Sequence, residues 1–286
     1  MTPISSGTVY LVGAGPGDPE LLTLRAYKLL QRTDVVLHDG LVPVAIVSLA
    51  NPNAKVVNVG KRCGKKGITQ TEINFLMIEH ARLGKSVVRL KSGDPAIFGR
   101  LAEETDALVA ANIPFEIVPG ITAALAITAS LGVSLTDRRK SSRIVIVSGH
   151  RAPANEPNPR NDWRALAQED ATLIVYMPGR DLSPLRNEFL HAGLPAETPA
   201  VVVSRAATPT QREWLTTIAK LNSLPPIESP SLLLVGRSLE QACPRTSADN
   251  RTPASDSLDW KSVLAFVESE IAAESSPDHP ERKVVR

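Results

Sequence analysis

Apolar residues fall into two patterns that alternate along the chain. Continuous apolar runs are typical of strands buried on both faces of a sheet, whereas apolar residues at every third or fourth position are typical of amphipathic helices. In the first half, the predicted strands are residues 9–12, 35–38, 56–59, 86–90 and 115–118, and the predicted helices are residues 21–30, 44–50, 70 to about 84, and 101–111. This alternation predicts a largely parallel sheet covered on both faces by helices.

The start of one predicted helix carries a specific signal. Thr69 and Glu72 have the spacing of a capping box, in which each side chain bonds a backbone N–H at the other end of the turn. The helix that they open would place four residues on one face, namely Ile73, Leu76, Met77 and His80. We interpret Met77 and His80 as packing residues of that face and not as ligands.

A second series of alternating strands and helices is predicted after the pattern of apolar and polar residues changes near residue 119. Residues 121–131 are small and apolar nearly all round, which predicts a buried helix. The strands predicted after it are residues 144–147, 172–176, 199–203, 211–215 and 231–235, and the helices are residues 163–167 and 185–191. We therefore expect an N-terminal α/β domain in residues 1–122 and a C-terminal α/β domain in residues 123–240. Residues 241–286 are interpreted as a linker and a partly disordered tail, in which 258–273 could form one helix.

Composition narrows the class of protein. Apolar residues make up 43% of the 286 residues and aromatic residues only 4%, so the expected cores are aliphatic. The net charge of +2 is too close to zero to indicate a nucleic acid or a membrane as the main partner. Cys63 and Cys243 form neither a metal motif nor a disulfide framework, which favours a reducing cytoplasm. The chain shows no signal-peptide pattern, no apolar stretch of the ~20 residues that span a bilayer, and no histidine spacing that predicts a metal site.

A glycine-rich turn, residues 13–18, follows the first predicted strand and precedes a helix. Such a turn at the carboxyl end of a strand lets a ligand approach the backbone closely. It is not the dinucleotide fingerprint, because Asp18 stands where the third glycine would be and Pro16 stiffens the turn. It is not a Walker phosphate loop either, because no Lys-Ser/Thr pair follows. From these residues alone, a tight turn without a ligand remains an equal alternative.

Charged residues after three other strands are candidates for chemistry. Asp39 follows the second strand, where it could face a ligand or simply form an Asx turn before Gly40. Four cations, Lys61, Arg62, Lys65 and Lys66, either line a solvated surface or attract an anionic ligand. Residues 92–95, Ser-Gly-Asp-Pro, could form a ligand-binding wall or a turn whose backbone Asp94 fixes.

Five segments of the sequence, taken together, resemble the corresponding segments of one known family. Residues 13–18, 35–42, 59–64, 88–100 and 118–123 are similar in order and spacing to the tetrapyrrole methylases, the class III S-adenosylmethionine-dependent methyltransferases. The resemblance runs from about residue 9 to residue 236. It implies two α/β domains with an active-site cleft between them, a homodimer, S-adenosyl-L-methionine as cosubstrate and no metal. Within the family, the blocks are most similar to those of enzymes that methylate two carbons of uroporphyrinogen III to give precorrin-2, for cobalamin, sirohaem or haem d1.

The resemblance also implies roles for individual residues. Asp39 would be the base that removes a proton after methylation, and Lys61 a proton donor. Arg62, Lys65 and Lys66 would bind the carboxylates of the substrate. The residues implied to contact the cosubstrate are Pro16, Ser92, Gly93, Asp94, Ile97, Thr122, Ala123, Met177 and Ala206.

Several positions depart from the family pattern and leave the substrate open. Gly40 replaces an arginine, Ala96 an aromatic residue, and Leu101-Ala102 a glycine pair. Two alternatives therefore remain, a methylase of a later precorrin and a non-catalytic tetrapyrrole-binding relative. A nicotinamide-dependent dehydrogenase is disfavoured, because the glycine pattern of the first turn does not fit.

Overall fold

The computed structural model describes residues 7–60, 68–149 and 161–242, and these all lie in one compact unit that spans Met1–Pro244. The cations predicted to bind substrate or donate a proton, Lys61, Arg62, Lys65 and Lys66, lie outside the described residues. The predicted tail helix, 258–273, lies outside them as well.

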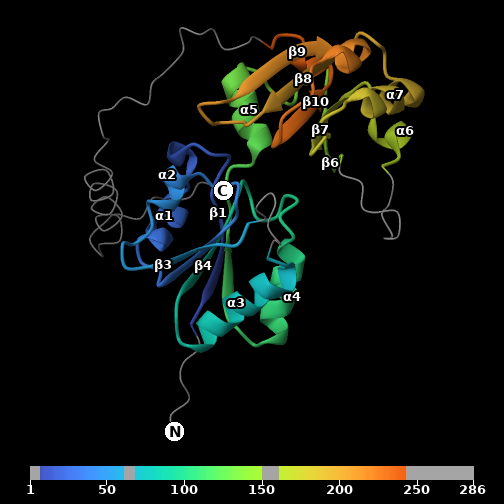
Figure 1. Cartoon of the computed structure of the whole chain (residues 1–286). Coiled ribbons are helices and arrows are strands. Elements are labelled where there is room, and N and C mark those ends of the chain that lie inside the picture. Colours follow the sequence, from blue (N-terminus) through green and yellow to red (C-terminus); the bar gives the residue numbers. More distant parts are fainter. Residues whose placement is uncertain (1–6, 61–67, 150–160, 243–286) are drawn as a thin grey trace, which may run out of the picture. The chain divides into compact units, whose positions relative to one another are not determined.

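The first half forms a five-stranded sheet in which every pair of neighbouring strands is parallel (Figure 1). Its strands are β1 (Val9–Gly13), β2 (Val35–His38), β3 (Lys55–Asn58), β4 (Val87–Lys91) and β5 (Phe115–Val118). They are arranged in the order β3-β2-β4-β1-β5, so β4 is central. The predicted parallel sheet is confirmed.

Helices cover both faces of this first sheet (Figure 1). They are η1 (Pro19–Leu21), α1 (Leu24–Leu30), α2 (Val44–Val47), α3 (Gln70–Arg82) and α4 (Leu101–Ala110). On one face, α1 and α2 pack Leu30 and Ile46 against the strands. On the other face, α3 and α4 pack Met77 and Leu108. Each strand therefore contributes side chains to two separate cores.

Capping side chains set the starts of η1, α1 and α3. The capping box of α3 is present, with both the Thr69 and Glu72 bonds formed. The single helix predicted over residues 21–30 was wrong, because two caps divide it. Asp18 caps the 3-10 turn η1 by accepting a bond from Glu20 N, and the Thr23 hydroxyl then caps α1. Helix α2 is also shorter than the predicted 44–50.

The second half forms a mixed five-stranded sheet. Its strands are β6 (Arg143–Ser148), β7 (Ala171–Tyr176), β8 (Pro199–Ser204), β9 (Arg212–Thr217) and β10 (Ser231–Val235), in the order β6-β7-β10-β8-β9. Only β6 and β7 pair in parallel; the other three pairs are antiparallel. A short loop joins β8 to β9, and such a connection suits an antiparallel pair because a parallel return needs a long crossover.

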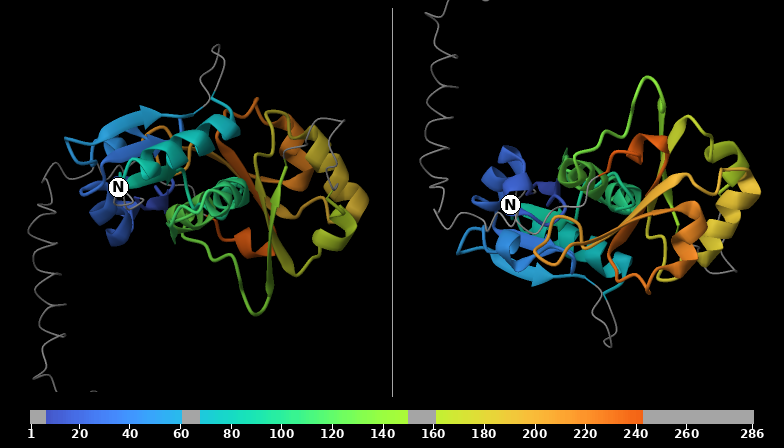
Figure 2. Two further views of the ribbon diagram at one scale, coloured as in Figure 1. Left: turned by 90° about the horizontal axis from the view of Figure 1, so that it is seen from below. Right: turned by 90° about the horizontal axis from the view of Figure 1, so that it is seen from above.

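The helices of the second half also lie on both faces of their sheet (Figure 2). They are α5 (Ala123–Leu131), α6 (Trp163–Leu166), α7 (Ser183–Ala192), η2 (Ile218–Ser223) and η3 (Arg237–Leu239). Helix α5 packs Ile127 and Leu131 against one face, and α6, α7 and η2 cover the other. The prediction that residues 121–131 form a buried helix was wrong in part, because α5 begins at Ala123 and its Leu125 is 53% exposed. The division into domains at residues 122 and 240 stays a prediction.

Candidate functional site

Three loops meet at the carboxyl ends of β1, β4 and β5. Gly15 and Gly93 form an isolated bridge, with Gly93 N donating to Gly15 O at 2.7 Å and Gly15 N to Gly93 O at 3.1 Å. A Cβ atom on Gly120 would lie 2.3 Å from Gly93 O, and one on Gly13 would lie 2.6 Å from the Gly120 Cα. The glycines at these positions are needed because three backbones come into contact. The glycine-rich turn, residues 13–18, is thus in contact with the loops that follow β4 and β5.

Asp94 ties two of these loops together. Its Oδ1 accepts a bond from Ala96 N at 2.8 Å, and its Oδ2 accepts one from Gly120 N at 2.9 Å. The expectation that Asp94 fixes a turn is confirmed. Ile97 N bonds Asp94 O at 3.2 Å, so the same residue also orders the start of the following segment. A direct contact of Asp94 with a cosubstrate stays a prediction.

Tyr176 links the junction to the second sheet. Thr122 is the N-cap residue of α5, but its hydroxyl bonds the Tyr176 hydroxyl at 2.5 Å instead of capping the helix. The Tyr176 hydroxyl also accepts a bond from Ala124 N, and its ring lies 5.2 Å from that of Phe98. Burial raises the pKa of the Tyr176 hydroxyl, so it stays protonated. Neither aromatic residue was predicted for the site, although aromatics are rare in this chain.

The loop after β8 completes the junction. A Cβ on Gly17 would lie 3.2 Å from Ala207 O and 3.7 Å from Ala206 O, so these loops are in close contact. Non-glycine residues with positive φ gather in this loop and in those that follow β4 and β7: Phe98, Arg100, Met177, Arg205 and Ala207. Such strained backbone is typical of ligand-binding and catalytic sites.

The residues predicted to contact the cosubstrate therefore share one connected set of loops. We call this set the loop junction: residues 13–17, 92–100, 119–123, 176–178 and 205–208. It contains all of the predicted cosubstrate contacts, namely Pro16, Ser92, Gly93, Asp94, Ile97, Thr122, Ala123, Met177 and Ala206. Met177 is 46% exposed and Ala206 is 8% exposed. Their contacts with a ligand stay predictions.

Charged side chains form a buried network beside this junction. The Asp39 Oδ1 lies 2.5 Å from Nη2 of Arg89, whose Nε lies 2.9 Å from Glu104. Lys91 Nζ pairs with the other oxygen of Glu104 at 2.6 Å. Burial lowers the pKa of Lys91, and the Arg89 cation lowers it further, whereas Glu104 opposes the shift.

Three members of this network, Arg89, Lys91 and Glu104, were not predicted from the sequence. Arg89 and Lys91 alternate along a strand whose other residues are apolar, which places both cations on one face of a buried strand. That spacing was the available signal. Glu104 is fully buried in α4, although the adjacent Glu103 is exposed and pairs with Arg100.

The Leu101-Ala102 departure from the family pattern has a local explanation. Leu101 packs against the hydrophobic core under α3 and α4, and the neighbouring Ala102 is exposed. This change therefore adds bulk to the core of the first sheet. Gly40 lies against Gly60, and this contact requires glycine at position 60, since a Cβ on Gly60 would lie 2.1 Å from the Gly40 nitrogen.

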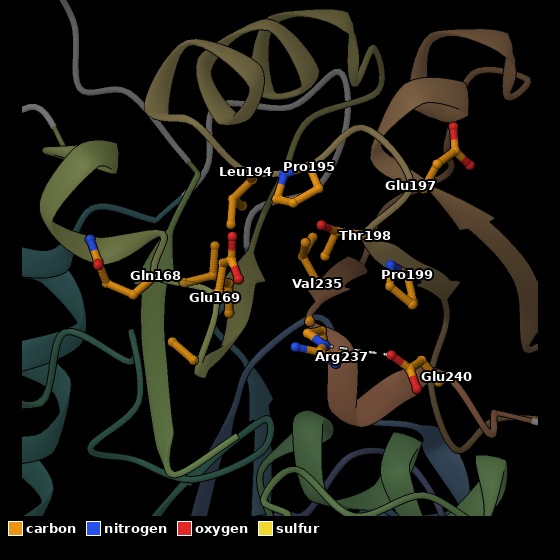
Figure 3. Close-up of a pocket in the computed structure, with 13 residues that line it drawn as sticks. Gln168, Glu169, Leu194, Pro195, Glu197, Thr198, Pro199, Val235, Arg237 and Glu240 are labelled. Atoms are coloured by element: carbon orange, nitrogen blue, oxygen red, sulfur yellow. Dashed lines mark ion pairs between the residues drawn. The ribbon is translucent and has the colours of Figure 1, made fainter. Parts of the chain in front are cut away.

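A separate hollow lies at one end of the second sheet (Figure 3). It has a volume of about 250 Å³, with Leu173, Leu194 and Val235 in its wall, and Glu240 and Arg237 form an ion pair at its edge. None of the described residues predicted for the site lines it. Within residues 7–60, 68–149 and 161–242, no helix is long and apolar enough to cross a membrane. The same residues contain no cluster of three side chains that could bind a metal ion.

Comparisons with known proteins match most of the chain. A model of the family described as tetrapyrrole (corrin/porphyrin) methylases matches residues 8–222. An S-adenosyl-L-methionine-dependent uroporphyrinogen III methyltransferase from Methanosarcina barkeri is 40% identical over 233 residues, covering 80% of this chain and 91% of the relative. Siroheme synthase 1 from Halorhodospira halophila is 42% identical over 241 residues, but the match covers 83% of this chain and only 49% of the relative. The chain thus spans about half the length of that curated relative.

A solved structure gives a similar match. The uroporphyrin-III C-methyl transferase of Thermus thermophilus, complexed with S-adenyl homocysteine, is 38% identical with a TM-score of 0.70. The match covers 82% of this chain and 94% of that one.

Proposed function

Because the chain belongs to the tetrapyrrole (corrin/porphyrin) methylase family, we propose that it is a uroporphyrinogen III C-methyltransferase. It transfers two methyl groups from S-adenosyl-L-methionine to uroporphyrinogen III and produces precorrin-2 and S-adenosylhomocysteine. The observation that carries this proposal is the similarity to the Methanosarcina barkeri methyltransferase, which extends over 91% of that relative. The product would enter cobalamin, sirohaem or haem d1 synthesis.

The loop junction is the proposed cosubstrate site. Its walls are mostly backbone, with the glycines of residues 13–17 and Gly93 and Gly120 allowing close approach. A methyl sulfonium needs no acidic partner, because carbonyl oxygens can surround its polarised C–H groups. Both sheets contribute, since the ring of Phe98, in the loop that follows β4, lies 5.2 Å from the ring of Tyr176 at the end of β7. This supports a site in a cleft between the two predicted domains.

The proposed reaction is a direct transfer followed by loss of a proton. A pyrrole carbon attacks the methyl group, the C–S bond breaks, and its electron pair stays on sulfur as neutral S-adenosylhomocysteine. The ring then carries a positive charge until it releases a proton to the Asp39 carboxylate. Most of the rate enhancement would come from holding the methyl group and the ring carbon in line.

Cations outside the described residues have proposed roles in handling the substrate. Lys61 would donate a proton, and Arg62, Lys65 and Lys66 would attract the carboxylates of uroporphyrinogen III. Arg100, in the loop junction, is exposed and pairs with Glu103. It could take part in the same attraction once the substrate competes with Glu103.

Assembly and location are also proposals. Leu125 on α5 and Ile144 and Ile146 on the edge strand β6 are each more than 40% exposed. These apolar side chains support a homodimer that covers them. The cysteine usage supports a reducing cytoplasm.

The test is methyl transfer from labelled S-adenosyl-L-methionine to uroporphyrinogen III, with the products analysed by mass. The proposal predicts two methyl groups per macrocycle. Transfer to a later precorrin but not to uroporphyrinogen III would favour the first alternative. Binding of tetrapyrrole without transfer would favour a non-catalytic relative.

A further inference from the structure

A chain of alternating charges leads from the core of the first sheet to Asp39. Lys91 and Arg89 point from β4 toward the face that α4 covers, and Glu104 of α4 bridges them. The side chains of Arg89 and Lys91 are 3% exposed and that of Glu104 is 0% exposed, whereas Asp39 is 31% exposed. The network therefore has a buried end and one end that reaches solvent.

Stability of the fold does not explain this network. Removing the charged groups of Arg89, Lys91 and Glu104 from water is expensive, and well-packed apolar residues of similar size are often equally or more stabilising in their place. The neighbouring positions of β4, Val87, Val88 and Leu90, are apolar and buried. Arg89 itself stands in register with Leu37 on one side and Leu11 on the other. An aliphatic side chain would suit this position by its surroundings alone.

The geometry fixes the guanidinium of Arg89 on all sides. Its Nε bonds Glu104, its Nη2 bonds Asp39, and its Nη1 lies 3.4 Å from the carbonyl oxygens of Leu37 and Leu90. Glu104 is held in turn by Lys91 and by Gln70 at 3.3 Å. Arginine presents its donors in a planar fork, so this arrangement leaves the group no freedom to rotate.

The Asp39 carboxylate is consequently held from one side. Within the described residues, the contacts of this carboxylate involve Oδ1 alone, and Asp39 N is anchored to Leu90 O at 3.0 Å. The carboxylate cannot turn without breaking the bond to Arg89. Its Oδ2 is the oxygen that remains to meet a substrate.

We propose that Arg89 is a positioning residue for methyl transfer, which, supported by Glu104 and Lys91, holds Asp39 with Oδ2 toward the substrate. The inference rests on the proposed function. In the reaction, the proton released by the methylated ring passes to Oδ2, while Oδ1 keeps its bond to Arg89. Arg89, Glu104 and Lys91 exchange no protons. Their contribution is to keep the base at the angle and distance that proton transfer needs.

A double-mutant cycle tests this inference. Arg89→Lys keeps the positive charge but replaces the fork by one ammonium group, which cannot hold Asp39 and Glu104 in the same way. We expect its single-turnover methylation rate to fall by about 10- to 100-fold, with the affinity for S-adenosylhomocysteine unchanged. Because Arg89 acts through Asp39, the double variant Arg89→Lys/Asp39→Asn should be no slower than Asp39→Asn alone.

Matched variants separate positioning from structural damage. Val88→Ala alters the opposite face of the same strand and should keep the parent rate in the folded protein. Glu104→Gln retains an acceptor for Arg89 Nε and serves if Arg89→Lys does not fold; it should also lower the rate only when Asp39 is present. An undiminished rate in a folded Arg89→Lys or Glu104→Gln variant, or rate losses that multiply with that of Asp39→Asn, would overturn the inference. Absence of methyl transfer in the parent protein would instead refute the proposed function.

Discussion

The central strands of the two sheets, β4 and β10, are both buried along their whole length but are built from different residues. β4 carries Arg89 and Lys91 among its apolar side chains, and both pair with Glu104. β10 consists of leucine and valine after Ser231. One strand brings a charged network to the edge of the loop junction, whereas the other supplies only packing.

Hydroxyl groups at one end of the second sheet strengthen this contrast. Ser141, Thr172 and Ser238 form a short chain of neutral hydroxyl groups with distances of 2.8 and 2.7 Å. Neutral hydroxyls that bond one another cost little to bury, whereas charges cost much more. The first sheet therefore contains buried charged groups, whose desolvation is expensive, near the predicted catalytic residue Asp39. The second sheet contains neutral groups that stabilise the fold.

The largest expected effect is on catalysis by Asp39. Asp39→Asn keeps the size of the side chain and an oxygen that can form the turn, so the fold should survive. General base catalysis typically contributes ~10²–10⁴-fold, and we expect the single-turnover methylation rate to fall within that range. S-adenosylhomocysteine binding should be nearly unchanged. A parent-like rate in the folded variant would leave Asp39 as a turn residue only.

Lys91→Met should break the charged network from its buried end. Glu104 would lose one of its two cations in a site without water exposure, and removal of one partner of a buried pair typically costs about 3–5 kcal/mol. The free energy of unfolding in urea measures this loss. If the free energy of unfolding of the variant equals that of the parent, an apolar residue at position 91 stabilises the fold as well as the lysine does.

Leu233→Ala in β10 is the corresponding change in the second sheet. Leu233 is fully buried, and truncation of a buried leucine typically costs about 2–5 kcal/mol. Since β10 contributes packing and no residue of the proposed site, the methylation rate of the folded variant should match that of the parent. A rate loss at saturating substrates and at a temperature where the variant is folded would contradict the division of roles between the sheets.

Tyr176→Phe should have a smaller effect at the contact between the halves. The change removes the hydroxyl that bonds Thr122 and Ala124 N, and an unsatisfied buried polar group costs about 1–3 kcal/mol. Thr122 belongs to the proposed cosubstrate site, so the affinity for S-adenosylhomocysteine should also weaken. Calorimetric titration checks this; unchanged affinity together with lowered stability would make Tyr176 a packing residue only.

The smallest effect concerns the pH dependence of stability through His80. Burial lowers the pKa of His80 below its ordinary value of 6.5, and Lys55 contributes to the lowering. The unfolded chain therefore binds the proton more readily, so the stability contributed by neutral His80 is present above about pH 6.5 and is lost as the pH falls below it. His80→Leu should reduce this dependence in denaturant titrations between pH 5 and pH 7. An identical dependence in both proteins would exclude His80 as its source.

Much of the fold could be predicted from the sequence, because most of its interior strands, such as Val35–His38 and Ser231–Val235, are largely aliphatic runs. The capping box at Thr69 located α3 for the same local reason. Pairing direction in the second sheet could not be predicted in this way, since a run such as Ser231–Val235 suits parallel and antiparallel neighbours equally. The exposure of Leu125 was also missed, because a helix of small apolar residues carries no polar face to mark its outer side.

The site was predicted unevenly. Glycine and Asp-Pro turns can be recognised in the sequence, and the turns predicted in this way form part of the loop junction. The partners of Asp39 were not found. The alternation of Arg89 and Lys91 along an apolar strand was a signal for two of them. No local signal distinguishes Glu104 from the adjacent Glu103, yet only Glu104 is buried. Tyr176 was missed because its role depends on a contact with Thr122, which is distant in the chain.

The most direct test of the account is to locate S-adenosylhomocysteine by hydrogen–deuterium exchange. A ligand that binds the native state protects the amides it orders. We expect protection in residues 13–17, 92–100, 119–123, 176–178 and 205–208, and none at Gln168, Glu169 or Glu197 beside the hollow of the second sheet. Protection confined to that hollow, or no protection at a saturating concentration, would contradict the assignment of the loop junction as the cosubstrate site.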